Sequence, residues 1–316
     1  MTVVTSSAAP IDLTTNPRRH RKDVAARWVF RLGAWTTFLV TILILLTLVV
    51  DAWDFVSKLL DEPGGLARLT DIGWFPRRGL YDIGTLVIGT LLVTGIAMLV
   101  AVPLGLGVAV YLAEYAPRRV RRVVKPAVEL LAGIPSVVLG YFAIATINPQ
   151  FVTRVFSSAD KAFTLMAAGI AVGILTIPII ATVAEDALRA VPMALREASF
   201  GLGAHRLQST FQIVFPAAIS GIVAAVILGI SRAVGETMVV AIAAGAVGGG
   251  LRSWDPLHPG QTMTAAMAAL GFGSDQVAGD NLAFQSLYFI GLLLFFMTFV
   301  LNVVSDLLVR RVREEY

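Results

Sequence analysis

Long apolar runs alternate with short polar segments along the chain, and this pattern predicts six membrane-spanning helices. Each run exceeds the roughly 20 residues that a helix needs to cross the hydrocarbon core of a bilayer. The apolar character is continuous rather than alternating, which favours helices over the strands of a membrane barrel. The predicted spans cover residues 29–50, 83–113, 127–147, 162–184, 214–247 and 285–309.

The basic residues predict how these helices are oriented. If the N-terminus lies inside, the inner polar segments hold 17 of the 25 Lys and Arg residues and the outer segments hold seven. Cytoplasmic segments are the ones enriched in Lys and Arg, so both termini are expected in the cytoplasm. Residues 1–28 are polar and basic and are expected to form a disordered cytoplasmic tail. Residues 29–316 form the expected transmembrane domain, with its core at 83–309.

Composition supports an all-α integral membrane protein, with 57% hydrophobic and only 15% charged residues. The absence of cysteine excludes disulfides and thiolate metal sites, and the three histidines lie far apart, so no metal site is expected. The net charge of +4 comes from basic residues beside apolar segments, which is a topology signal. We therefore expect membrane lipid, and no nucleic acid, as a partner.

Known catalytic and nucleotide-binding signatures are absent from the sequence. It contains no Gly-Lys pair, and hence no Walker A loop, and neither a His-Glu-x-x-His nor a Gly-x-Ser-x-Gly motif. The chain is therefore not expected to be an enzyme by itself or to bind a cofactor. If it moves a solute uphill, the energy comes from another chain or from an ion gradient.

The second to fifth predicted spans are unusually rich in Pro and Gly. Pro103, Pro135 and Pro178 lie inside spans, and the fifth span has small residues at four-residue spacing (Gly221, Ala225 and Gly229). Small residues let membrane helices pack closely, and Pro is tolerated where neighbouring helices or a water-filled cavity satisfy the freed backbone groups. For any one of these residues, close packing of the helices is a sufficient explanation. Their concentration in four consecutive spans favours a bundle that lines a pathway.

The inner loop 185–213 has the composition of a short surface helix followed by a turn. Pro192 suits the start of a helix, and Gly201 and Gly203 allow the chain to leave it in a tight or left-handed conformation.

A motif in this loop resembles the EAA loop of bacterial ABC importer permeases. It runs from Glu197-Ala198-Ser199 through Gly203 to Ile213, Phe215 and Pro216, with Ser199 and Phe215 where that family often has Ala and Leu. The resemblance implies the type I, MetI-like permease fold and a loop that docks into a separate ATPase subunit. The residues assigned to this coupling are Arg196, Glu197, Ala198, Ser199 and Gly203.

Three further stretches resemble the phosphate-specific permeases, and the Gly235-Glu236-Thr237-Met238 run is more like the PstC half than the PstA half. The stretches are 102–116, 131–141 and 232–238. The resemblance implies a bacterial plasma-membrane protein that forms half of the pathway for phosphate. Its implied partners are a second, PstA-like permease, a dimer of cytosolic ATPases that binds ATP and Mg²⁺, and an extracytoplasmic phosphate-binding protein.

Arg232 and Glu236 are the only charged residues in the 31-residue run 217–247. They are four residues apart, so a continuous helix would place them on one face. Charges inside a membrane are costly, and they mark functional sites by default. We expect Arg232 to contact phosphate in transit, because a guanidinium matches a tetrahedral oxyanion. We expect Glu236 to orient Arg232, and Thr237 and Ser136 to be neutral hydrogen-bond donors to the phosphate. The structural alternative is an ion pair that only locks the bundle.

Three other functions compete with this interpretation. The closest is a permease of the same architecture for another oxyanion, such as sulfate or molybdate. An ion-coupled secondary transporter needs no ATPase, although no inverted repeat is evident. A membrane-bound enzyme is disfavoured because no nucleophile–base pair or metal constellation occurs.

Overall fold

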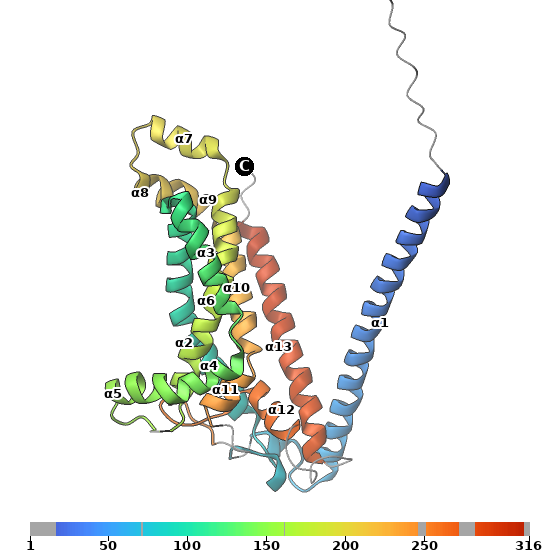
Figure 1. The fold of residues 1–316 in the computed structure, drawn as a ribbon. Helices are drawn as coiled ribbons and strands as arrows, with labels where there is room; N and C mark the ends of the chain where they lie inside the picture. The colour runs from blue at the N-terminus through green and yellow to red at the C-terminus, as the bar shows by residue number, and fades with distance from the viewer. Residues whose placement is uncertain (1–16, 71, 161, 246–250, 272–281, 313–316) are drawn as a thin grey trace, which may run out of the picture. The chain divides into compact units, whose positions relative to one another are not determined.

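The computed structural model describes residues 17–70, 72–160, 162–245, 251–271 and 282–312, which are mostly helical (Figure 1). The α-helices are α1 Pro17–Asp61, α2 Ile83–Val110, α3 Arg118–Ala132, α4 Ser136–Phe142, α5 Thr153–Val155, α6 Leu165–Ala190, α7 Met193–Gly201, α8 Arg206–Gln208, α9 Phe215–Ala217, α10 Ile219–Val234, α11 Met238–Ala243, α12 Met263–Gly271 and α13 Leu282–Val312. Wider π-type turns occupy Tyr111–Tyr115, Ala143–Val152 and Ser209–Val214. The strands β1 Trp74–Phe75 and β2 Leu80–Tyr81 form a short antiparallel hairpin.

Five helical stretches are long and apolar enough to span a membrane, and a bent pair would make a sixth. The five are Ala26–Asp61, Ile83–Tyr115, Ser136–Val155, Leu165–Ala190 and Leu282–Leu307. The bent pair, Arg206–Ala217 and Ile219–Val234, turns by 72° at Ala218. The all-α membrane fold is therefore confirmed, although the bounds of several spans differ from the predicted ones.

The chain divides into two compact units, residues 1–48 and 49–316. In the first unit, α1 begins at Pro17 and so includes residues 17–28 of the predicted tail; residues 1–16 lie outside the described part. Its apolar side chains, such as Trp35 and Phe38, are exposed, as expected of a helix whose surroundings are lipid. In the second unit, Phe55 packs edge-on against Tyr81 with 5.2 Å between the ring centroids.

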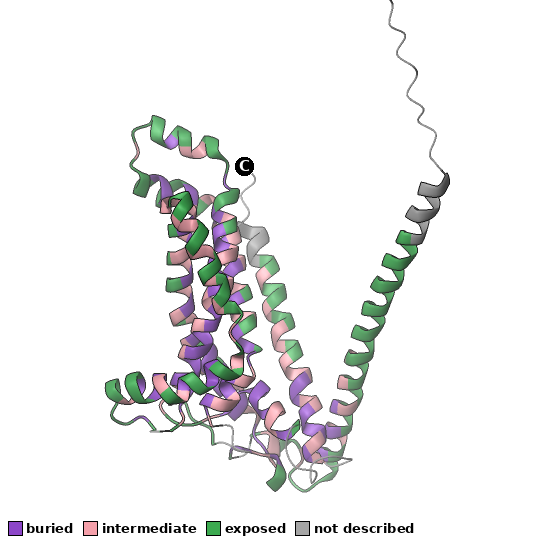
Figure 2. Cartoon of the chain, in the orientation of Figure 1, coloured by how far each residue is buried: buried purple, intermediate pink, exposed green. Residues whose placement is uncertain are grey.

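The centre of the second unit is the contact of α2 and α10 with α6. A Cβ on Gly169 or Gly173 of α6 would come within 3 Å of α2, which shows how closely these helices approach. The predicted small-residue face of α10 packs on α6 too, since Gly221 faces Ala187 and Gly229 faces Ile180. Figure 2 shows the buried residues concentrated along these helices. The close packing inferred from Gly and Ala is confirmed.

The third predicted span, 127–147, is wrong because the helix breaks inside it. Gly133-Ile134-Pro135 separates the amphipathic α3 from α4, and α4 continues through residues 143–152 into α5. Pro135 has no N–H to donate and disfavours helical geometry at Ile134, which explains the break. In Figure 1, α3 runs along the bundle beside α6, whereas the stretch from α4 to α5 crosses its other end.

The fifth predicted span, 214–247, is interrupted twice. The bend at Ala218 separates α9 from α10, and α10 ends at Val234, with Gly235 as its C-cap. Glu236 therefore lies beyond the helix that carries Arg232, and the prediction that one helix face holds both is wrong. Residues 246 and 247 of this predicted span lie outside the described residues.

Gly89 gives a direct test of this packing. Gly89 and Gly95 both belong to α2. A Cβ on Gly89 would clash with the backbone oxygen of Gln261, whereas a Cβ on Gly95 would meet nothing within 4 Å. We expect Gly89→Ala to destabilise the protein by about 2 kcal/mol or more through overpacking. Gly95→Ala should be neutral or stabilising, by up to about 1 kcal/mol. Thermal unfolding in detergent measures both, and equal melting temperatures would contradict the packing.

Candidate functional site

The predicted coupling helix exists as α7 and lies across one end of the bundle (Figure 1). Pro192 is its N-cap, and Gly203 leaves it in the left-handed region at a φ of 83°. Glu197 and Ala198 are exposed. Exposed apolar side chains surround them in the same loop, at Met193, Phe200, Leu202 and Leu207. A charged and apolar surface of this kind is suited to binding another protein.

Arg196 turns away from that surface and ties α7 to two other helices. Its guanidinium donates to the backbone oxygens of Leu188 at 2.8 Å and Val191 at 2.6 Å, at the end of α6. It also pairs with Glu114 at 2.9 Å, in the turn that ends α2, and both side chains are nearly buried. Unpaired carbonyls at a helix C-terminus attract a cation, which adds to the ion pair. Arg196 is therefore a positioning residue of α7.

Ser199 also faces inward. Its hydroxyl lies 2.8 Å from the backbone oxygen of Arg196 and 2.7 Å from the hydroxyl of Ser209, which begins the π-type turn leading to α9. The five predicted coupling residues thus divide by role. Glu197 and Ala198 form the surface, Arg196 and Ser199 hold the helix in place, and Gly203 allows the turn.

A buried carboxylate that was not predicted from the sequence lies near the end of α6. Glu185 of α6 is 1% exposed, and two cations of α3 hold it: Arg121 at 2.6 Å and Lys125 at 3.1 Å. Lys125 lies 3.6 Å from Asp186 as well. The signal was present in the sequence as a basic run, 118–125, and an acidic pair, 185–186, on neighbouring inner segments. Glu185 belongs to α6 rather than to the coupling loop.

The intramembrane ion pair forms despite the end of α10. The Nη1 atom of Arg232 donates to Oε2 of Glu236 at 2.8 Å. Glu236 is 4% exposed, and its other oxygen accepts from the N–H of Val239 at 3.3 Å, at the start of α11. The Arg232 side chain is 42% exposed. A guanidinium has five N–H donors, so several remain available to an anion.

Thr237 directly follows Glu236 in the chain, but within the described residues neither Thr237 nor Ser136 makes a hydrogen bond to the pair. The Thr237 hydroxyl donates to the backbone oxygen of Gly235 at 3.3 Å. Ser136 begins α4, which packs on α11 where Gly140 meets Ile242. Thr264 of α12 is a contact that the sequence did not suggest, since its hydroxyl donates to the backbone oxygen of Glu236 at 2.7 Å.

A second missed ion pair holds the other end of the bundle. Asp82 is fully buried as the N-cap of α2, where it accepts from the N–H of Gly84, from Thr85 and from Arg252. Burial alone would raise the pKa of Asp82, but the hydrogen bonds from Arg252, Thr85 and Gly84 outweigh it and lower that pKa. Because the pKa is lower in the folded protein than in the unfolded chain, the ionised Asp82 stabilises the fold at any pH above its unfolded-state pKa. This stabilisation is lost only as the pH falls through the folded-state pKa. The pair is therefore intact at neutral pH.

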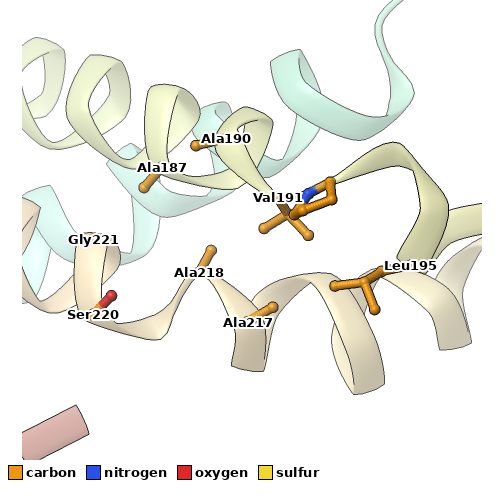
Figure 3. Close-up of a pocket in the computed structure, with 9 residues that line it drawn as sticks. Ala187, Ala190, Val191, Leu195, Ala217, Ala218, Ser220 and Gly221 are labelled. Atoms are coloured by element: carbon orange, nitrogen blue, oxygen red, sulfur yellow. The ribbon is translucent and has the colours of Figure 1, made fainter. Parts of the chain in front are cut away.

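An apolar hollow of about 260 Å³ lies where α6 turns into α7 (Figure 3). Ala187, Ala190 and Val191 line one side, and Ala217, Ala218 and Gly221 line the other, next to the bend at Ala218. Apart from Ser220 the side chains that line the hollow are apolar, so it is not suited to binding an anion. Among the described residues, no group of three or more His, Cys, Asp or Glu side chains has the arrangement of a metal site.

A model of the family "Binding-protein-dependent transport system inner membrane component" matches residues 101–314. The chain belongs to this family. The match includes α7 and Arg232, and it identifies a multi-pass inner membrane component of a transport system rather than an enzyme by itself. The type I permease assignment made from the EAA-type loop is confirmed.

Similar family members can be aligned with this chain over almost its whole length. The phosphate transport system permease protein PstC of Pasteurella multocida is 30% identical, with 96% of each chain covered. PstC 1 of Mycobacterium tuberculosis is 32% identical over 92% of this chain and 94% of its own. The PstC-like resemblance is thereby confirmed.

Solved structures of ABC transporters have the same fold. A chain of a bacterial alginate ABC transporter, in complex with an alginate-bound periplasmic protein, matches with a TM-score of 0.64 at 15% identity, over 92% of this chain and 97% of its own. A chain of the inward-facing MetNI methionine ABC transporter matches with a TM-score of 0.55 at 22% identity, over 73% and 97%. These likenesses confirm the MetI-like permease fold of this family member.

In this permease, Arg196→Ala tests the positioning role of that residue. The substitution leaves Glu114 without its partner and frees two backbone oxygens at the end of α6, which costs about 3 kcal/mol. We expect the melting temperature in detergent to fall by about 5 °C or more. Glu197→Ala, one residue along α7 and exposed, is the matched control and should leave it unchanged. Equal melting temperatures for both variants would show that Arg196 does not hold α7.

Proposed function

We propose that this chain is one permease half of an ATP-driven phosphate importer. The observation that carries the proposal is the pair Arg232–Glu236, in which a half-exposed guanidinium is held by a buried carboxylate in an otherwise uncharged stretch. The similarity to PstC proteins, which are named as phosphate transport permeases, supports phosphate as the solute.

The proposed role of Arg232 follows from its partial neutralisation. A free guanidinium would bind an oxyanion strongly, whereas conduction requires that binding be weak enough for release. Glu236 occupies one donor and is itself fixed by Val239, so Arg232 is oriented with donors to spare. Thr237 and Ser136, near the same junction of α4 and α11, are proposed as neutral donors once phosphate is bound.

The proposed source of energy is a separate ATPase dimer that binds ATP and Mg²⁺ and docks on Glu197, Ala198 and the apolar residues around them. Arg196 and Ser199 transmit the movement, because they join α7 to α6, α2 and the turn before α9. In this proposal α7 and both termini lie in the cytoplasm, as the positive-inside rule predicts.

The remaining proposed partners are a PstA-like permease and an extracytoplasmic phosphate-binding protein. The binding protein is proposed to meet the loops at the opposite end from α7, where Trp254 is 68% exposed. Because the family is binding-protein-dependent, an ion-coupled secondary transporter is set aside. A permease for sulfate or molybdate remains the second candidate, and competition among oxyanions for uptake distinguishes it.

The double variant Arg232→Ala/Glu236→Gln separates the functional role of Arg232 from a purely structural one. Arg232→Ala alone leaves a buried carboxylate unpaired and so tests stability as well as transport. With Glu236→Gln added, no charge is left unpaired. We expect phosphate uptake to remain about 10- to 100-fold below wild type, for one or two lost charge-assisted hydrogen bonds. Radiolabelled phosphate uptake by cells that assemble the complex measures this.

The exposed Arg154→Ala is the control and should transport normally. Normal uptake by the double variant would mean that Arg232 only neutralises Glu236, and the phosphate contact would be abandoned.

The charge reversal Glu197→Arg tests the docking surface. Since Glu197 is exposed, the fold should be unaffected, but the ATPase would meet a positive charge in place of a negative one. We expect ATP hydrolysis to continue while phosphate transport in proteoliposomes falls at least about tenfold, as for the loss of one charge-assisted contact. Transport still coupled to hydrolysis in Glu197→Arg would refute docking at this residue.

A further inference from the structure

A furrow along α3 changes from basic to apolar, and its apolar part is shared with α6. Its basic part is an open hollow of about 490 Å³ lined by α3 residues alone: Arg118, Arg121, Arg122, Lys125, Pro126 and Glu129. It continues as an apolar hollow of about 250 Å³ lined by Glu129, Ala132, Pro178, Ile179, Thr182 and Val183. Glu129 lines both parts, so they are continuous.

We propose that this furrow binds an anionic phospholipid, with the phosphate on Arg118 and Arg122 and an acyl chain in the apolar hollow. A basic pocket that continues into an apolar groove matches the two parts of a lipid, whereas a free anion would leave the groove unused. Clusters of about four to eight Lys or Arg residues on an amphipathic helix are known to bind anionic headgroups, and α3 carries such a cluster. The inner-leaflet position rests on the proposed cytoplasmic location of α7.

Charge pairing assigns the headgroup to two of the four cations. Arg121 and Lys125 are held by the buried Glu185. Arg118 and Arg122 have no acidic partner within the described residues, and both are exposed. They are four residues apart on α3, hence on one face, and two guanidinium groups there can hold one phosphate between them.

Glu129 does not oppose this assignment. It lies seven residues beyond Arg122, about 10 Å farther along the helix, where the headgroup gives way to the glycerol backbone and chains. Beyond it the lining is apolar except for Thr182, and Ala132 and Pro178 leave room for a chain.

The test measures lipid retention, not transport, so it can fail independently of the proposed function. The complex with its partner permease and ATPase is purified in detergent, titrated with phosphatidylglycerol or phosphatidylcholine, and analysed by native mass spectrometry. Arg122→Gln should retain phosphatidylglycerol about tenfold less than wild type, for one lost charge-assisted contact. Arg119→Gln is the matched control. It removes the same charge from the same helix, but from an exposed position that does not line the furrow, and should bind like wild type.

Ala132→Phe keeps every charge and fills the apolar hollow, so it tests the acyl-chain site even if Arg122→Gln does not assemble. It should weaken phosphatidylglycerol retention as well. Three results would overturn the proposal: equal retention of phosphatidylcholine, equal loss in Arg119→Gln, or full retention in Ala132→Phe. Displacement of the lipid by inorganic phosphate would assign the pocket to the free anion. Absence of bound lipid in wild type would likewise overturn the proposal.

Discussion

The ties made by Arg196 are the interaction on which the proposed mechanism depends. One guanidinium neutralises Glu114 at the end of α2 and satisfies two carbonyls at the end of α6. Because the pair is nearly buried, separating it would expose or strand a charge at a cost of several kcal/mol, about 3–5 in comparable cases. The helix α7 is therefore not free to move alone. A force on α7 is carried to the ends of α2 and α6 together.

From there the structure offers a continuous physical route to the intramembrane charges. The Ser199–Ser209 hydrogen bond joins α7 to the turn before α9, and the chain then bends at Ala218 beside the apolar hollow. Beyond the bend, α10 is packed tightly on α6 and ends next to Arg232. The Glu236 carboxylate accepts a hydrogen bond from the N–H of Val239 at the start of α11, and the Thr264 hydroxyl donates to the backbone oxygen of Glu236. The proposed anion contact thus sits at a junction of short helices, where a small shift would change its geometry.

The sequence predicted the elements whose cause is local, and it failed where tertiary contacts decide. Hydropathy placed four spans correctly, at 29–50, 83–113, 162–184 and 285–309, because span length is set by the bilayer. Pro192 and Gly203 placed α7, since their backbone preferences act within the loop. The helices on either side of Pro135, Ala218 and Gly235 were predicted as continuous spans, because a hydropathy window does not detect a change in helix direction. Arg196 was assigned to the coupling residues together with Glu197, but its inward role was not predicted, because its partner Glu114 is 82 residues away in sequence and carries no local signal. The same holds for Glu185 with Arg121 and for Asp82 with Arg252.

The central claim is that α7 controls the surroundings of Arg232. The sequence contains no cysteine, so Gly235→Cys introduces a single exposed thiol beside that residue. Its labelling rate with a membrane-impermeant maleimide is measured on this chain in the assembled complex, first nucleotide-free and then trapped with ATP. The account predicts a severalfold change in rate between the two states, and loss of that change when Arg196→Ala is added while ATP is still hydrolysed. An identical change with and without Arg196 would contradict it.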